Sequence, residues 1–219
     1  MIQTQRGDRP EAGTVIVSRC SDVNRASHIL ERDFQNAPVC FLSRGALQSL
    51  ARTWTGHVAD IALLNAEVGG EYAGFVLAQA RGKRFWQSVV REHPACLGSF
   101  AVAWARTRLR HQAGPHLAAG APVDVPVLDR PFEWSSASGV SMVEYLFVHS
   151  AFRGRRVAPA LLLEAERQMR AAGATKIEAH IDGQNFASVR AFLTAGWDVF
   201  RMTTDDFYTS KDLTLPPRR

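Results

Sequence analysis

A chain of 219 residues with 46% hydrophobic side chains is long enough for one well-buried domain, and no change in composition divides it into two. Its 26 Lys and Arg residues exceed its 21 Asp and Glu residues, which suits an anionic ligand, but no basic stripe interleaved with aromatics indicates nucleic-acid binding. Three widely spaced cysteines argue against a disulfide framework or a metal cluster, and no apolar run is long enough for a membrane span or a signal peptide. We therefore expect a cytoplasmic protein without a metal, with a polar tail over residues 1–13 and a single domain over residues 14–219.

The first part of the chain predicts a strand, two helices and a hairpin. Alternating apolar residues indicate the first strand, and Ser21 and Asp22 offer capping oxygens to the helix that follows it. Leucines at helical spacing indicate the second helix, and two apolar runs flank a turn that contains glycine. The expected ranges are 14–19, 23–34, 41–54, 58–65 and 72–80, with the hairpin turn at 67–71.

Residues 83–137 predict a helical insert that ends in a long loop. Large apolar residues recur at helical spacing in two blocks over residues 83–110, which are broken at His93-Pro94. Glycine, proline and alanine then dominate residues 111–131, a length that is uncommon for a loop and indicates either a mobile segment or a cover over a site.

The last part of the chain alternates strands and helices. One helix carries its apolar residues on one face and stops at Gly173, and another begins at Asn185 and ends at Gly196. This alternation predicts an α/β fold whose sheet contains parallel pairs with crossover helices. The strands are expected at 141–148, 176–181, 197–202 and 207–213.

Three arginines and a glycine stand where a strand runs into a helix, at residues 153–156. The first N–H groups of a helix have no partner within it, and the helix dipole leaves partial positive charge there. Gly154 would let a phosphate approach the backbone, and the arginines would add charge-assisted hydrogen bonds. Residues 153–158 can therefore cradle a diphosphate, although an arginine-rich helix start without a ligand is an equal alternative on physical grounds alone.

Two blocks of the sequence resemble the GNAT superfamily of N-acetyltransferases. Residues 148–158 are similar to its acyl-CoA signature, V-x-P-x-[YF]-R followed by [QR]-x-x-G-x-[GA], with Arg156 in the place of the middle glycine. Residues 185–197 resemble its N-x-x-[AS]-x-x-x-[YF]-x-x-x-G-[FW] helix, and FYTSKDL resembles its last strand. The order of the first elements is similar to a branch found with bacterial polysaccharide gene clusters. The resemblance covers residues 14–82 and 138–213.

This resemblance implies a mixed, splayed central sheet flanked by helices, with the insert between the third and fourth strands, and an acetyl-CoA-dependent N-acetyltransferase. The pantetheine arm of the donor would lie between two diverging strands, with its diphosphate on the helix start. Asn185 either bonds this arm or only caps its helix, and Phe192 stands at the family's tyrosine position but suits a core. Arg156 is expected at negative φ, where no glycine is needed. The implied donor-binding residues are Phe147, Val148, Arg153, Gly154, Arg155, Arg156, Val157, Ala158, Asn185 and Phe192.

Acetyl transfer to an amine needs a base for the amine and a proton for the departing thiolate. Glu144, four residues before Val148 on the same strand, is the leading candidate for the base. The alternative is that Glu144 is only a solvated or salt-bridged glutamate on a strand. Glu178 and His180 are the second choice. Tyr208, Tyr145 or water would protonate the thiolate, since Phe192 cannot.

The resemblance implies a small primary amine as acceptor, with an amino sugar or a sugar nucleotide first and amino-acid, peptide or antibiotic amines as rivals. A CoA-binding module without turnover is the alternative from another class. Residues 83–137 would wall the acceptor pocket, while residues 83–110 could instead contact a membrane surface or a lipid-linked sugar. The oligomeric state stays open, with a homodimer among the alternatives.

Overall fold

The structure is a computed structural model that describes residues 13–33, 44–56, 61–80, 139–182, 185–201 and 206–215. The insert predicted at residues 83–137, together with its surface for a membrane or an acceptor, lies outside these residues, and so does the predicted tail apart from its last residue.

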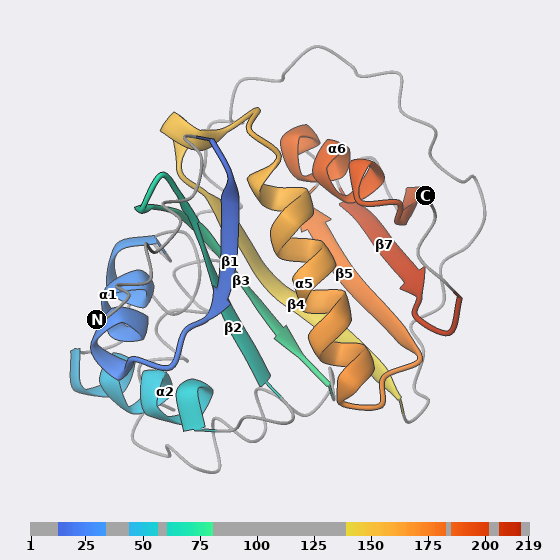
Figure 1. Cartoon of the computed structure of the whole chain (residues 1–219). Helices are drawn as coiled ribbons and strands as arrows, with labels where there is room; N and C mark the ends of the chain where they lie inside the picture. The colour runs from blue at the N-terminus through green and yellow to red at the C-terminus, as the bar shows by residue number, and fades with distance from the viewer. Residues whose placement is uncertain are drawn as a thin grey trace, which may run out of the picture.

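Seven strands form one mixed sheet in the described part of the chain. They are β1 (Val15–Arg19), β2 (Ile61–Val68), β3 (Glu71–Gln79), β4 (Val140–Val148), β5 (Lys176–Asp182), β6 (Asp198–Arg201) and β7 (Asp206–Asp212). Their order across the sheet is β1-β2-β3-β4-β5-β7-β6 (Figure 1), and only the pair of β4 with β5 is parallel. The expectation of several parallel pairs is therefore wrong, because β7 lies between β5 and β6 and runs antiparallel to both.

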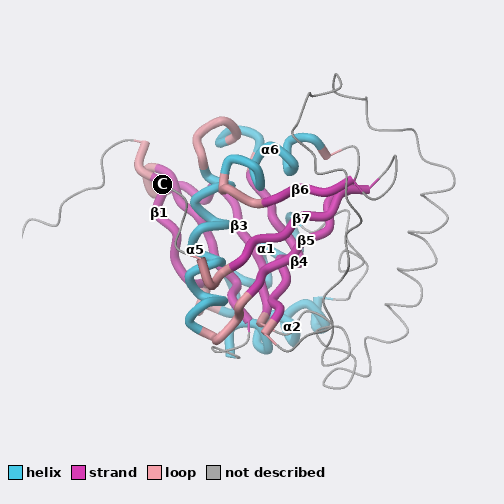
Figure 2. The backbone as a smooth tube through the Cα atoms, turned by 90° about the vertical axis from the view of Figure 1, so that its right-hand side faces the viewer, coloured by secondary structure: helices cyan, strands magenta, loops and turns pink. Residues whose placement is uncertain are grey.

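Helices cover both faces of this sheet. The described helices are α1 (Val23–Asp33), α2 (Arg44–Gly56), α5 (Val157–Ala171), α6 (Phe186–Thr194) and the 3₁₀ helix η3 (Ser150–Phe152). In Figure 1, α5 crosses in front of the strands, and Figure 2 shows it along one side of them. One apolar core joins α5 and α6 to the sheet through residues such as Leu161, Val143 and Ile177. A second core joins α1 and α2 to the other face through residues such as Leu30 and Leu77.

The hairpin between β2 and β3 is tighter than the sequence predicts. Val68 pairs with Glu71, so the turn consists of Gly69 and Gly70 alone rather than residues 67–71. Both glycines have positive φ, 62° and 83°, as two-residue hairpin turns of type I′ require. β2 consequently ends at Val68, three residues later than expected, because the strand continues up to the first residue that can adopt this conformation.

β4 and β5 diverge along their length, as the resemblance implies. They pair from Val140 with Lys176 to Val143 with Ala179, and no further. β4 continues to Val148 against β3, and β5 continues to Asp182 against β7. Residues 144–148 and 180–182 therefore face each other without sharing strand hydrogen bonds. We call this stretch the β4–β5 split.

A buried ion pair, which the sequence did not predict, holds α5 to the end of the chain. Glu166 on α5 is 2% exposed, and its Oε2 lies 2.8 Å from Nζ of Lys211 on β7. Its Oε1 accepts a hydrogen bond of 2.7 Å from the indole nitrogen of Trp197, and Lys211 also donates to the carbonyl oxygen of Ala195. Glu166 thus connects α5, the turn after α6 and β7 in one network.

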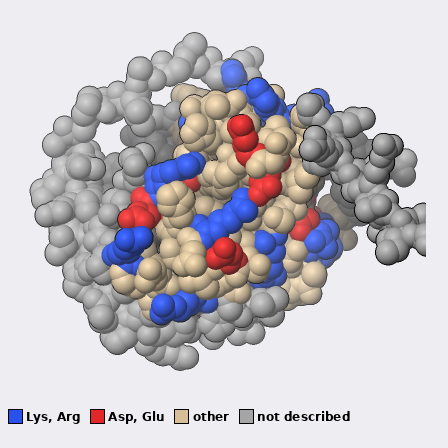
Figure 3. Space-filling view, turned by 60° about the vertical axis from the view of Figure 1, so that its left-hand side comes forward, with Lys and Arg blue, Asp and Glu red and all other residues tan. Residues whose placement is uncertain are grey.

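Charges of both signs are interspersed on the face drawn in Figure 3. This face therefore shows no concentration of one sign. Ion pairs in the described part of the chain include Arg25 with Glu67 and Arg167 with Glu164. Among the described helices, none is long and apolar enough to cross a membrane.

Candidate functional site

The turn that leads into α5 leaves several backbone amides without an acceptor. The amides of Arg153 and Arg155 close the turn on carbonyl oxygens of η3, each at 3.3 Å. The first α-helical hydrogen bond runs from Ala160 to Arg156, and Pro159 has no N–H to satisfy. In the described part of the chain, no acceptor meets the amides of Gly154, Arg156, Val157 and Ala158. These four donors lie at the positive end of α5, and the side chains of residues 153–156 are exposed, so the turn fits an anionic group.

The backbone of Arg156 differs from the expectation for this turn. Arg156 is the N-cap of α5 and has φ 60° and ψ 20°, in the left-handed region, whereas negative φ was expected. The expectation is wrong because Arg156 precedes the first turn of α5 rather than lying within it. Among the described residues it is the only one other than glycine with positive φ. A glycine at this position would adopt the same backbone without the steric cost that a side chain brings.

We predict that Arg156→Gly raises stability while weakening anion binding at this turn. Relief of the left-handed strain is expected to exceed the added flexibility of the unfolded chain, with a net gain of about 0.5–1 kcal/mol. Loss of the guanidinium removes a charge beside the four free amides, so the affinity for a diphosphate should fall and depend less on salt. Thermal unfolding and calorimetric titration with a nucleoside diphosphate at two salt concentrations measure both effects.

Arg155→Gly is the matched control, since it removes the same charge from a residue without positive φ. It should lower the melting temperature. A melting temperature for Arg156→Gly that is no higher than that of Arg155→Gly would show that the left-handed conformation carries no cost.

Backbone groups of β4 are available on the side of the split. The amide of His149 donates to the carbonyl oxygen of Ala73 at 2.9 Å, and backbone groups alternate in direction along a strand. Phe147 therefore directs its amide and carbonyl toward β3, while Leu146 and Val148 direct theirs toward the split. Sequence reasoning named Phe147 and Val148. The alternation supports Val148 and replaces Phe147 with Leu146.

Glu144 lies where the split begins. Leu77 pairs with Tyr145 and Ala78 with Val143, so Glu144 is the extra residue of a β-bulge. Its side chain is half-buried, and its Oε1 accepts a hydrogen bond from Nε2 of Gln79 on β3. Burial raises the pKa of Glu144 to about 7, and the hydrogen bond from Gln79 acts in the opposite direction. Such a carboxyl group can exchange a proton near neutral pH.

The other candidate acid and base residues lie on β5 and β7. His180 is the first β5 residue beyond the last pair with β4, and it is paired with Tyr208, with 5.0 Å between the ring centroids. Because Val143 and Ala179 point into the core under α5, Glu144 and His180 both point to the opposite face. The structure thus brings Glu144, His180 and Tyr208 to one face at the start of the split.

Glu178, a second-choice base, has a structural role instead. Its side chain is 1% exposed, and its Oε1 lies 2.6 Å from Nζ of Lys176. A carboxylate held in this way is an ion-pair partner rather than an accessible base. Among the described residues, no group of three or more His, Cys, Asp or Glu side chains is placed to hold a metal ion.

The second sequence block serves mainly the fold. Asn185 caps α6, with its Oδ1 accepting a hydrogen bond of 3.1 Å from the amide of Ser188. Phe192 is 3% exposed and packs edge-to-face against Trp197 with 4.8 Å between the ring centroids. Of the alternatives that the sequence left open, capping holds for Asn185 and core packing for Phe192, which is buried away from a donor. Sequence reasoning missed Gln79, although a lone glutamine at the end of the apolar run EYAGFVLAQ was a visible signal.

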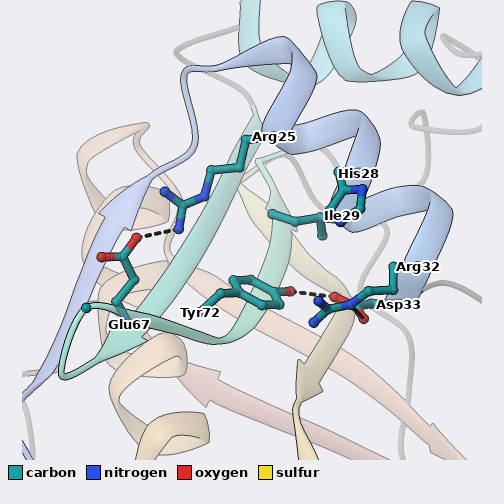
Figure 4. A pocket seen from close by; sticks show the side chains of 8 residues that line it. Arg25, His28, Ile29, Arg32, Asp33, Glu67 and Tyr72 are labelled. Carbon is teal, nitrogen blue, oxygen red and sulfur yellow. Dashed lines mark hydrogen bonds and ion pairs between the residues drawn. The ribbon is translucent and has the colours of Figure 1, made fainter.

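A separate open pocket of about 270 Å³ lies between α1 and the β2–β3 hairpin (Figure 4). Its carboxylates are already engaged. Asp33 accepts a hydrogen bond of 2.7 Å from the hydroxyl of Tyr72 and pairs with Arg32, and Glu67 pairs with Arg25. This pocket is on the face that α1 covers, whereas the turn of residues 153–156 leads into α5 on the opposite face, so it is not the anion site.

Comparisons with known proteins identify a family for this chain and solved structures with a similar fold. The model of the acetyltransferase (GNAT) family matches residues 25–197. Three similar solved structures are a GNAT-family acetyltransferase from Streptococcus pneumoniae, NAA60 from Arabidopsis thaliana in complex with acetyl-CoA, and ribosomal-protein-alanine N-acetyltransferase from Brucella melitensis. The Streptococcus structure has a TM-score of 0.54 at 10% identity, over 91% of this chain and 99% of its own. The Arabidopsis structure has a TM-score of 0.51 at 14% identity, over 92% of this chain and 100% of its own. The Brucella structure has a TM-score of 0.50 at 15% identity, over 90% of this chain and 99% of its own. At such identities they show a shared fold. A search of curated proteins finds no match to the sequence.

Proposed function

The chain belongs to the acetyltransferase (GNAT) family, and from this premise we propose that it moves the acetyl group of acetyl-CoA to a primary amine of a small molecule. The observation that carries the proposal is the β4–β5 split, which begins at the Glu144 carboxyl and leads to the free amides before α5. An acyl donor that lay along the split would have its charged diphosphate at the free amides and its reactive thioester near the Glu144 carboxyl.

The diphosphate of the donor would lie on the free amides of Gly154, Arg156, Val157 and Ala158. The pantetheine arm would extend along the split, with its amide groups bonded to Leu146 and Val148 in the manner of an added strand. From Val148 to Glu144 the strand spans about 13 Å, so the arm would bring its sulfur end to the carboxyl. Arg153, whose Nε lies 3.4 Å from the carbonyl oxygen of Val148, borders this path.

Glu144 would act as the base, directly or through a water. A primary amine is largely protonated at neutral pH, since alkyl ammonium groups have a pKa near 10. The ionised carboxylate of Glu144 would first take a proton from the ammonium group, which frees the lone pair of the nitrogen. As this nitrogen bonds to the acetyl carbon, the carbon–sulfur bond breaks. The thiolate of CoA takes a proton from Tyr208 or from water, and the second proton of the nitrogen replaces the one that Tyr208 or the water gave. His180, beside Tyr208, is the second candidate for proton transfer.

The proposed class of acceptor follows from the sequence resemblance rather than from the geometry of the site. An amino sugar or a sugar nucleotide comes first because the early elements resemble the branch found with polysaccharide genes. Amino-acid, peptide and antibiotic amines are the alternatives, and the relatives from Brucella and Arabidopsis are similar in fold alone. A module that binds CoA without turnover is less favoured, because CoA binding alone does not need a half-buried carboxyl where the split begins.

The test is release of free thiol from acetyl-CoA in the presence of a panel of amines, with mass spectrometry of each product. The panel contains amino sugars, sugar nucleotides, amino acids, short peptides and aminoglycosides. We expect amine-dependent thiol release with one class and a mass increase of one acetyl group in its product. Tight CoA binding with no release for any amine would contradict the transferase proposal and favour the binding module.

A further inference from the structure

We propose that Gln79 is a positioning residue for the transfer reaction, which fixes one oxygen of the Glu144 carboxylate and leaves the other to accept the proton of the amine. This inference rests on the proposed function, in which Glu144 is the base. Gln79 lies on β3, outside the sequence block that resembles the acyl-CoA signature.

The bulge in β4 explains why Glu144 needs a partner. Because Glu144 has no cross-strand neighbour on β3, the strand pairing does not orient its side chain. Gln79, opposite Met142, lies close enough for its Nε2 to donate to Oε1 of Glu144. Within the described ranges, no donor meets Oε2 of Glu144. One oxygen is thus held and the other is left to a substrate or a water.

The burial of Gln79 supports a specific role. It is 3% exposed at the end of a strand whose preceding residues, Phe75 to Ala78, are buried and apolar. A buried amide is costly unless it is hydrogen-bonded, and a leucine or a methionine would fill this position without that cost. The hydrogen bond to the Glu144 carboxylate offsets part of this cost.

Gln79 also acts on the ionisation of Glu144. Burial favours the neutral carboxyl, whereas a hydrogen bond donated to a carboxylate favours the ionised form. The ionisable groups nearest in the sheet are Glu178, which is paired with Lys176, and His180 on the adjacent β5, Tyr208 on β7 beyond it, and Tyr145 on β4 itself. Among the described residues, burial and Gln79 alone shift the pKa of Glu144. Removal of the amide should therefore raise this pKa further and leave less base at neutral pH.

The experiment is the pH profile of kcat/KM for Gln79→Leu, with Gln79→Met as a second variant in case one folds poorly. Loss of a hydrogen bond to a charged group should move the inflection near pH 7 upward by about 1 unit and lower kcat/KM at pH 7 about 5-fold. The rate on the alkaline side of the inflection should recover to within a few fold, which a general loss of structure would not allow.

Asn65→Leu is the matched control, since Asn65 is another buried strand amide, 2% exposed, on the neighbouring β2. Its inflection should stay in place. Glu144→Gln separates the two possible failures. If Glu144→Gln keeps the inflection, Glu144 is not the base, and the roles of Glu144 and Gln79 both fall while the transferase activity itself stands. If Glu144→Gln loses it while both Gln79 variants keep it at the wild-type pH, the positioning role alone is overturned.

Discussion

Glu144→Gln is expected to lower kcat/KM near pH 7.5 by about 10²–10⁴-fold, the usual contribution of a general base. The amide has nearly the shape of the carboxylate and can still accept the hydrogen bond from Gln79, so the fold and the donor site should be retained. The loss should be much smaller at high pH, where the amine is already deprotonated. Initial rates of thiol release across pH, together with CoA affinity by calorimetry, measure this.

The same substitution should make the protein more stable above neutral pH. The folded state raises the pKa of Glu144 to about 7 from an unfolded value near 4.3, so it holds a proton that the unfolded chain releases. The free energy of unfolding therefore falls as pH rises from about 4 to 7, by about 3–4 kcal/mol in total, and stays at the lower level above pH 7. Glu144→Gln removes this loss, so the variant should match the wild type at pH 4 and exceed it at pH 8.

Glu67→Gln is the control for both measurements, since Glu67 pairs with Arg25 at the surface beside α1. Its kinetics should match those of the wild type. An unchanged rate of Glu144→Gln at neutral pH would remove Glu144 from the mechanism. Equal stability of Glu144→Gln and the wild type at pH 8 would show that the carboxyl is better solvated than its burial implies.

Glu166→Ala is expected to reduce the free energy of unfolding by about 3–5 kcal/mol. The substitution leaves the ammonium of Lys211, 11% exposed, and the indole N–H of Trp197 without their shared acceptor. A buried charge without a partner is far more costly than the ion pair that it replaces. Urea unfolding followed by circular dichroism should show a lower midpoint with an unchanged slope.

Two comparisons test the cause of this loss. Glu164→Ala, on the same helix, breaks an exposed pair with Arg167 and should change the midpoint little. Glu166→Leu combined with Lys211→Met should recover much of the lost stability, because apolar groups of similar size remove the uncompensated charge. A loss for Glu166→Ala no greater than that for Glu164→Ala would show that the network does not stabilise the fold.

The order of the described helices and strands could be predicted from the sequence, and so could the turn that we propose for the anion, because each depends on residues close together in the chain. Apolar periodicity marks the strands and helices, and Gly154 with its arginines at a helix start marks the turn. The insertion of β7 between β5 and β6 could not be predicted in this way, because β6 and β7 follow each other in the chain and the same pattern fits either order. The left-handed backbone of Arg156 was missed because the sequence places the start of α5 only to within a residue or two.

The sequence by itself determined where the proposed site would lie: at a glutamate on the strand before an arginine-rich helix start, and at the amides of that start. Only the tertiary structure decided which partners meet them. Gln79 reaches Glu144 from 65 residues away along the chain, and Lys211 reaches Glu166 from 45. Local preferences depend on backbone and side-chain forces within a few residues and leave their pattern in the sequence. Contacts between distant residues, and the pKa values that burial sets, exist only once the sheet has closed around them.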